Sequence, residues 1–165
     1  MLEQRVYEIL TKSGWNEGRK IDITKQITVL ENNDYKVFDV AKRFIEEFGE
    51  LSITPKYIDF FNEEDYDEHT THLEDIRYYY EKKENYDENV GESTIPVCKL
   101  YTGEYVVCIS ESGKFFIDQG MIAENTEDFW NGVLGEYKFG FLNWKDYMMG
   151  KDLSSIKRCK NELYY

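Results

Sequence analysis

The sequence predicts an α+β fold, a mostly antiparallel sheet of meander type with helices packed on one of its faces. Four runs rich in branched and aromatic residues lie between 95 and 124, and the gaps between them are short and contain Gly103, Gly113 or Gly120. Gaps this short force neighbouring strands to be antiparallel. Amphipathic patterns of period 3.6 lie before and after these runs, so helices and strands are segregated along the chain. At 165 residues the chain suits a single domain, 1–165.

Three helices are expected first. Segment 2–12 is a short amphipathic helix that Ser13 and Gly14 should stop, and Asp22 is a plausible N-cap for a second helix ending near residue 32. Segment 35–51 carries the clearest pattern, with Asp34 as a possible N-cap and Gly49 where a left-handed C-terminal residue is favoured. Its apolar stripe consists of Val37, Val40, Ala41, Phe44, Ile45 and Phe48.

The loop between the first two helices holds Trp15 and Arg19. An aromatic ring and a guanidinium are typical interface anchors, but a Trp between two helices more often fills core volume. An Arg four residues later more often ties a loop to a carboxylate or a carbonyl. A structural role is therefore the favoured interpretation of both side chains.

Segments 51–53 and 57–61 are short β-rich runs that should begin the sheet. The composition then changes, because segment 62–92 holds twelve acidic and three basic side chains, a net charge of −9. Within it, residues 71–83 have the pattern of a helix with Leu73, Ile76, Tyr79 and Tyr80 inward. The flanks 62–70 and 84–92 are expected to be loops, the second one mobile.

The β-rich part contains strands at 95–101, 104–110, 114–118 and 121–124, the second of which is apolar on both faces. A helix over 126–134 follows, capped by Asn125 or Thr126. A single core is expected, with six residues mostly buried: Trp15, Phe44, Phe48, Val107, Phe129 and Trp130. Beyond it, 137–147 is rich in aromatic residues and 153–163 is a weak helix.

Charge and hydropathy narrow the possible partners. The net charge of −13 repels nucleic-acid backbones and anionic membranes, so neither is expected as a partner. The charge either complements a basic protein or serves only solubility.

No run of about 18 apolar residues and no signal-peptide pattern occurs, which favours a cytoplasmic protein. Cys98, Cys108 and Cys159 lack metal or disulfide spacing, and the first two fit small core residues.

Patterns for catalysis are weak throughout. His69 and His72 are three residues apart, but the Glu of a helical zinc motif is missing, so solvent-facing loop histidines are the favoured interpretation. The chain lacks a nucleophile elbow and a phosphate loop, and its carboxylates lie in polar stretches where water keeps them ionised. We therefore predict no metal, no cofactor and no catalytic residues.

Several short motifs at the front of the chain resemble the SUKH superfamily, and most closely its third, bacterial subgroup. They are Gly14-Trp15, Gly18-Arg19, the Ile21-Asp22-Ile23 step and the helix end 44–51 with Phe44, Phe48 and Gly49. Segments 95–97, 106–109 and 113–118 are similar to the central strands of that family. The resemblance covers roughly residues 5–135 and leaves 136–165 as a C-terminal extension. It implies an immunity protein, an antitoxin that binds and neutralises a toxin.

The resemblance also implies a kind of partner, since the toxins of this superfamily are frequently nucleases or deaminases with basic clefts. The acidic stretch 62–92 could mimic a phosphate backbone for such a cleft, with Tyr66, Tyr78 and Tyr86 adding contact area, or it could be an ordinary solvated face. The alternatives in function are a regulatory scaffold of SUKH type and an enzyme with an unrecognised site. The candidate toxin-binding residues are Glu63, Glu64, Asp65, Tyr66, Asp67, Glu68, Asp87 and Glu88.

Overall fold

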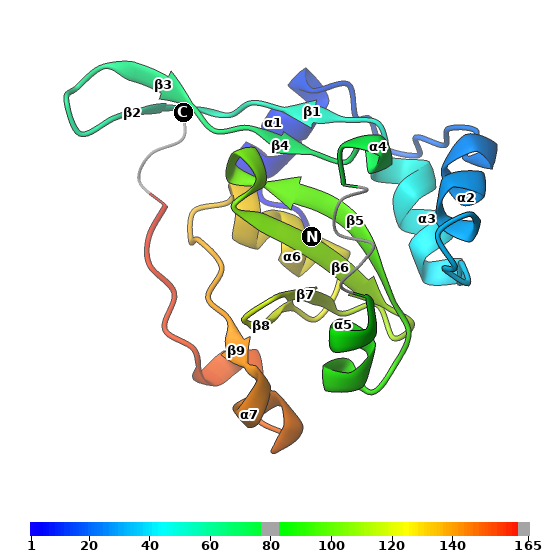
Figure 1. Ribbon diagram of the computed structural model, residues 1–165. Coiled ribbons are helices and arrows are strands. Elements are labelled where there is room, and N and C mark those ends of the chain that lie inside the picture. The colour runs from blue at the N-terminus through cyan, green and yellow to red at the C-terminus, as the bar shows by residue number, and fades with distance from the viewer. Residues whose placement is uncertain (77–82, 162–165) are drawn as a thin grey trace.

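The computed structural model describes residues 1–76 and 83–161 and confirms the predicted α+β fold (Figure 1). In the described ranges, seven strands form one antiparallel sheet in the order β1-β4-β5-β6-β7-β8-β9. The expected meander is its centre. The strands are β1 Ser52–Ile53, β4 His69–Thr70, β5 Thr94–Leu100, β6 Tyr105–Ser110, β7 Phe115–Ile117, β8 Gly120–Ala123 and β9 Leu142–Asn143.

Five helices of the described ranges contribute to the larger hydrophobic cluster: α1 Gln4–Lys12, α2 Thr24–Glu31, α3 Asp39–Phe48, α4 Leu73–Ile76 and α6 Thr126–Leu134. Phe44 of α3 lies at its centre, with ring centroids 5.4 Å from Phe115 and 6.2 Å from Trp130. Such aromatic packing adds stabilisation beyond the burial of area. All six side chains expected in the core are buried, as are Cys98 and Cys108.

A second, smaller cluster makes the expectation of a single core wrong. Successive side chains of a strand point to opposite faces, and in β7 Phe115 and Ile117 belong to the larger cluster while Phe116 belongs to the smaller. The elements that cover the second face supply Tyr86, Val90 and Leu153. They are α5 Lys83–Val90, α7 Trp144–Met148 and the 3-10 helix Leu153–Ser155.

The end of α3 differs from the expectation in its backbone. Gly49 has φ −64°, so it is not left-handed, and the left-handed residue is Glu50 at φ 59°. A glycine is still needed at 49, because a Cβ there would overlap the carbonyl oxygen of Ile45. The helix also begins later than expected, with Phe38 rather than Asp34 at the N-cap.

Several segments expected to be loops are ordered. Segment 62–70 contains β3 Glu64–Tyr66 and β4, and 84–92 lies largely in α5. Strand β2, Lys56–Ile58, pairs with β3 in a separate two-stranded sheet and not in the main sheet. The helix expected over 71–83 begins as α4 Leu73–Ile76, and its continuation with Tyr78, Tyr79 and Tyr80 lies outside the described residues.

The segment after α6 differs from its expectation as well. The helix expected over 153–163 is limited to the 3-10 turn 153–155, and residues 162–165 lie outside the described part. Among the described residues, no helix combines the length and the apolar character that a membrane crossing requires.

Candidate partner-binding surface

The most prominent surface feature is the hairpin 56–66, formed by β2, β3 and the turn between them. Its register pairs Lys56 with Tyr66 and Ile58 with Glu64. The backbone N–H of Asp67 donates to the carbonyl of Pro55 at 3.0 Å. This hydrogen bond links the two chain segments between the β2–β3 pair and the β1–β4 pair. The two sheets therefore form one long ribbon, and Figure 1 shows its outer part projecting beyond the main sheet.

The turn of the hairpin is specified by its own side chains. Asp59 accepts hydrogen bonds from the backbone N–H groups of Phe61 at 2.9 Å and Glu63 at 2.8 Å. Asn62 takes the left-handed conformation at φ 64°, which Asn tolerates better than most residues. The backbone N–H of Asp59 donates to the carbonyl of Glu63 at 2.8 Å and closes a three-residue loop.

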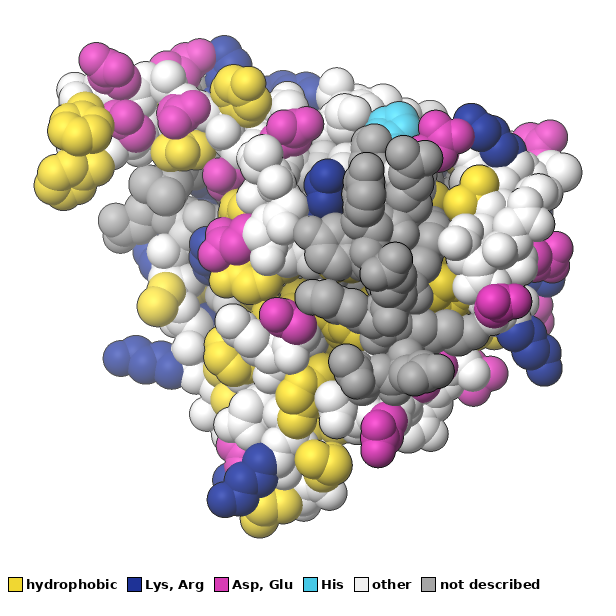
Figure 2. Space-filling view, in the orientation of Figure 1, with side chains coloured by type: hydrophobic (Ala, Val, Ile, Leu, Met, Phe, Trp, Pro, Cys, Tyr) yellow, Lys and Arg dark blue, Asp and Glu magenta, His cyan; other side chains and the backbone are white. Residues whose placement is uncertain are grey.

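This turn places large apolar side chains in water. Phe60 is 97% exposed and Phe61 is 80% exposed, and Tyr66 on β3 is 60% exposed. Figure 2 shows hydrophobic atoms gathered at the tip of the projection, with acidic side chains behind them. Exposed rings that are fixed by the backbone are typical of a surface used for binding.

Acidic side chains surround these rings. The predicted binding residues Glu63, Glu64, Asp65 and Tyr66 are exposed on the hairpin, and Asp67 and Glu68 follow directly after it. Lys56 pairs with Glu64 at 2.5 Å. Partial desolvation and the negative field of Asp65 and Asp67 raise the pKa of the Tyr57 phenol. The hairpin is thus a region of strongly negative potential with an apolar tip.

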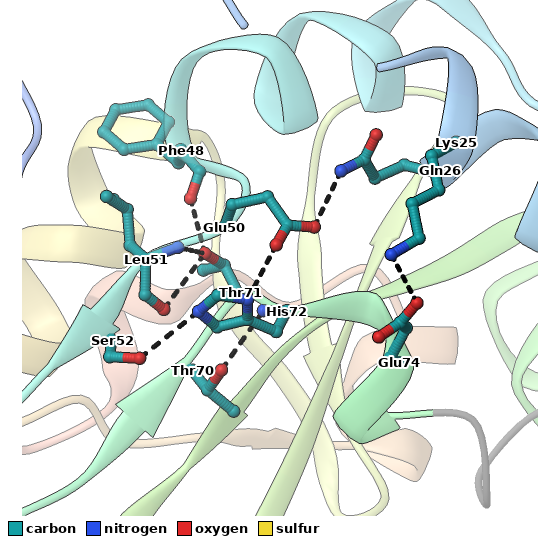
Figure 3. Close-up of polar contacts among 10 residues, drawn as sticks. All are labelled: Lys25, Gln26, Phe48, Glu50, Leu51, Ser52, Thr70, Thr71, His72 and Glu74. Carbon is teal, nitrogen blue, oxygen red and sulfur yellow. Dashed lines mark hydrogen bonds and ion pairs between the residues drawn. The ribbon is translucent and has the colours of Figure 1, made fainter. Parts of the chain in front are cut away.

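A polar network attaches the base of the ribbon to the helical layer (Figure 3). The buried hydroxyl of Thr71 donates to the carbonyl of Phe48 at 2.5 Å and accepts from the backbone N–H of Leu51 at 2.9 Å. Glu50 accepts from Gln26 of α2 at 2.7 Å, and Lys25 pairs with Glu74 of α4 at 2.7 Å.

The same network contains a serine, a histidine and a carboxylate in hydrogen-bonding order. Nδ1 of His72 lies 2.7 Å from Glu50, and Nε2 lies 3.2 Å from the hydroxyl of Ser52. Burial acts to raise the pKa of the Glu50 carboxyl, but hydrogen bonds from Gln26 and His72 outweigh it and leave that pKa lowered. Ser52 is exposed on the edge strand β1, Glu50 lies between α3 and β1, and His72 lies between β4 and α4, so these bonds join the two strands to the helices. The group therefore acts as a clamp on the ribbon.

The two histidines occupy different environments. His69 was expected to face solvent, but it is buried in β4, and its Nδ1 accepts from the backbone N–H of Tyr101 at 3.1 Å. Burial lowers the pKa of His69 to about 3, with a further contribution from Lys138. His72 is partly exposed in the clamp. No group of three or more metal-binding side chains occurs among the residues that the structure describes.

The second half of the predicted acidic surface lies elsewhere. Asp87 and Glu88 are on α5, which packs near α7 and away from the hairpin (Figure 1). Asp87 accepts from the backbone N–H and the hydroxyl of Thr94, so it fixes α5 to β5. Tyr86, expected as an exposed contact, is buried in the smaller cluster. The structure therefore divides the acidic stretch into two separate regions.

Sequence reasoning missed Phe60 and Phe61, which it placed inside a strand. The available signal is that two adjacent rings break the alternation of a half-buried strand, and that Asp59 and Asn62, both frequent in turns, enclose them. These four residues form the turn.

The motif residues at the front of the chain have structural roles, as expected. Trp15 stacks on Phe48 with 5.8 Å between centroids, and Arg19 donates to the carbonyl of Glu47 at 2.8 Å. Gly14 and Gly18 both have positive φ, at 98° and 77°, in the loop that carries these side chains. The motif thus joins the first loop to the end of α3.

The sheet is packed on both faces, and the charged hairpin with its exposed rings projects from it, which is the arrangement typical of a binding surface. The family model described as SUKH-3 immunity protein matches residues 2–136, and the chain belongs to this family. Searches of curated proteins and of solved structures found no match. The family resemblance seen in the sequence is confirmed; membership supports a role in immunity and implies a cognate toxin as the partner.

Proposed function

We propose that this chain neutralises its cognate toxin by direct binding in the cytoplasm, with the hairpin 56–66 covering a basic cleft of the toxin. Family membership supports an immunity role, and the hairpin is the observation that carries the mode of binding. From residue 56 to residue 68 the chain has six acidic side chains and one lysine. A nuclease or a deaminase, whose cleft receives a phosphate backbone, is the toxin class that such a surface fits best.

Electrostatics gives the proposal its kinetic signature. Opposite charges accelerate encounter and can raise association rate constants toward about 10⁸ M⁻¹s⁻¹ at low salt. At physiological ionic strength the Debye length is about 8 Å, so added salt removes most of this acceleration. Association through the hairpin should therefore be fast and strongly dependent on salt.

The test removes the charges and keeps the fold. In the hairpin variant, Glu63, Glu64 and Glu68 become Gln, and Asp65 and Asp67 become Ser. In the matched control variant, five exposed acids elsewhere are neutralised to the corresponding amides: Glu8, Glu17, Glu31, Glu111 and Asp118. Both variants have the same net charge, so only the position of the charge differs.

The binding partner in this test is an inactivated toxin domain, taken from the product of the gene directly upstream if that product is a secreted protein with a toxic C-terminal domain. Association is measured at about 50 and 200 mM salt. We expect the hairpin variant to associate at least tenfold more slowly at the lower salt, with less effect at the higher. The thermal midpoint should change little, because exposed charges contribute little to folding. Equal association rates for the two variants at both salt concentrations would exclude the hairpin as the electrostatic contact. A single Glu88→Gln variant tests α5 separately.

A further inference from the structure

Building on the proposed function, we infer that Phe60 and Phe61 are the apolar anchor of the interface and enter a hydrophobic pocket at the rim of the toxin's basic cleft. The charges around them set how fast the two proteins meet. The two rings set how long the complex lasts.

Within residues 1–76 and 83–161, no packing interaction in the two hydrophobic clusters explains the rings. Neither ring belongs to either hydrophobic cluster, and no residue of 56–66 does so among the described side chains. At 97% and 80% exposure the two rings are almost wholly in water. Burial of both against a partner is therefore available as binding free energy, with no loss of internal packing.

The geometry of the turn prepares the rings for binding. Asp59 fixes the turn through two backbone hydrogen bonds, and Asn62 completes it in the left-handed region. The two rings pack edge to face with centroids 5.9 Å apart, so each restricts the other. An aromatic side chain on a fixed backbone loses little conformational entropy on binding, which favours a long-lived complex.

The surroundings of the rings define the chemistry of the partner. Asp59, Glu63 and Glu64 lie within a few residues of the tip, so the receiving pocket must be apolar inside and basic at its rim. The same charges oppose insertion into an anionic lipid surface. A basic protein with an apolar pocket is thus the occupant that fits both features.

The chain offers a matched control for apolar exposure. Met148 and Met149 are also adjacent and exposed, at 66% and 64%, at the end of α7 on a part of the surface distant from the hairpin (Figure 1). The test therefore compares Phe60→Ser/Phe61→Ser with Met148→Ser/Met149→Ser. Serine is well tolerated in turns, so the hairpin should persist in the first variant.

Dissociation from the same inactivated toxin domain is the deciding measurement. We expect the phenylalanine variant to dissociate roughly tenfold or more faster than wild type, with association changed less than about threefold. The methionine variant should dissociate like wild type. Urea midpoints of both variants should stay near that of wild type, which shows that the fold is kept.

The outcomes separate this inference from the proposed function. If wild type binds the toxin domain and the phenylalanine variant dissociates just as slowly, the anchor is refuted while neutralisation by binding stands. Faster dissociation of the methionine variant alone would place the anchor on α7. Failure of wild type to bind overturns both proposals. Sedimentation with phosphatidylcholine–phosphatidylglycerol vesicles that requires Phe60 and Phe61 would instead assign the rings to a membrane.

Discussion

Replacement of Thr71 by valine tests the attachment of the ribbon to the body of the protein. Thr71 follows β4 directly and is 1% exposed. In space, its side chain bridges the end of α3 and the residue before β1. Its hydroxyl accepts from the backbone N–H of Leu51 at 2.9 Å and donates to the carbonyl of Phe48 at 2.5 Å. Valine has the same shape and lacks both capabilities, so the substitution removes these two hydrogen bonds and the longer one to the carbonyl of Leu51 at 3.4 Å, without opening a cavity.

The magnitude follows from the burial of these groups. A buried backbone group that loses its partner costs about 1–3 kcal/mol, and here one donor and one acceptor are affected. We expect Thr71→Val to lower the free energy of unfolding by about 2–6 kcal/mol. For a chain of this length, each kcal/mol corresponds to a fall of about 2–4 °C in the thermal midpoint.

The matched control is Thr28→Val, which makes the same chemical change on an exposed face of α2. The Thr28 hydroxyl donates to the carbonyl of Thr24 at 2.9 Å, and water can replace that bond. This variant should stay within about 0.5 kcal/mol of wild type. Urea unfolding monitored by tryptophan fluorescence and by circular dichroism measures both. If Thr71→Val loses no more than Thr28→Val, the reasoning about the ribbon base is wrong.

Two further predictions concern a buried ring and a glycine. The pKa of His69 is lowered from 6.5 to about 3 in the folded chain. As the pH falls, the unfolded chain therefore protonates this imidazole at a higher pH than the folded chain does, and the free energy of unfolding falls between about pH 6.5 and pH 3. At pH 5 the loss is roughly 2 kcal/mol, and urea midpoints at pH 7 and 5 should differ less in His69→Asn than in wild type. Gly120 has φ 145°, and a Cβ there would overlap the carbonyl of Leu142; Gly91 has φ 77° and open space around it. Gly120→Ala should therefore destabilise by more than about 2 kcal/mol and Gly91→Ala by about 1 kcal/mol, and a reversed order in urea unfolding would contradict this.

Periodicity predicted the main parts of the fold because the burial of apolar side chains determines them. The apolar stripe on α3 is buried when the helix packs on the sheet. The strand β6, which is apolar on both faces, is satisfied in the middle of a sheet that is covered on both sides. The second core was missed because α5 lies in a sequence dominated by charge, and the two side chains it is described to bury, Tyr86 and Val90, make no clear pattern. The carboxylate of Asp87 adds a hydrogen bond that attaches α5 to β5, and such a tertiary contact leaves no periodic signal.

The candidate surface could be predicted in composition and not in shape. Charge density alone identified residues 63–68, but it could not show that 64–66 form a strand that pairs with 56–58 and projects from the sheet. Nor could it separate them from Asp87 and Glu88, which are near in sequence and lie on a different part of the molecule. The short strands β2 and β3 are specified by the turn between them more than by any alternation of apolar and polar side chains along each strand.

The independence of the hairpin from both hydrophobic clusters bears on how such a chain can change over time. Residues 56–66 are attached through the clamp at the ribbon base and supply no side chain to the clusters formed by the described residues. Substitutions at exposed hairpin positions other than Asp59 and Asn62, which define the turn, should therefore change the folding free energy little. On the proposed role of the hairpin, a lineage could exchange one hairpin sequence for another and retarget the protein in few mutational steps.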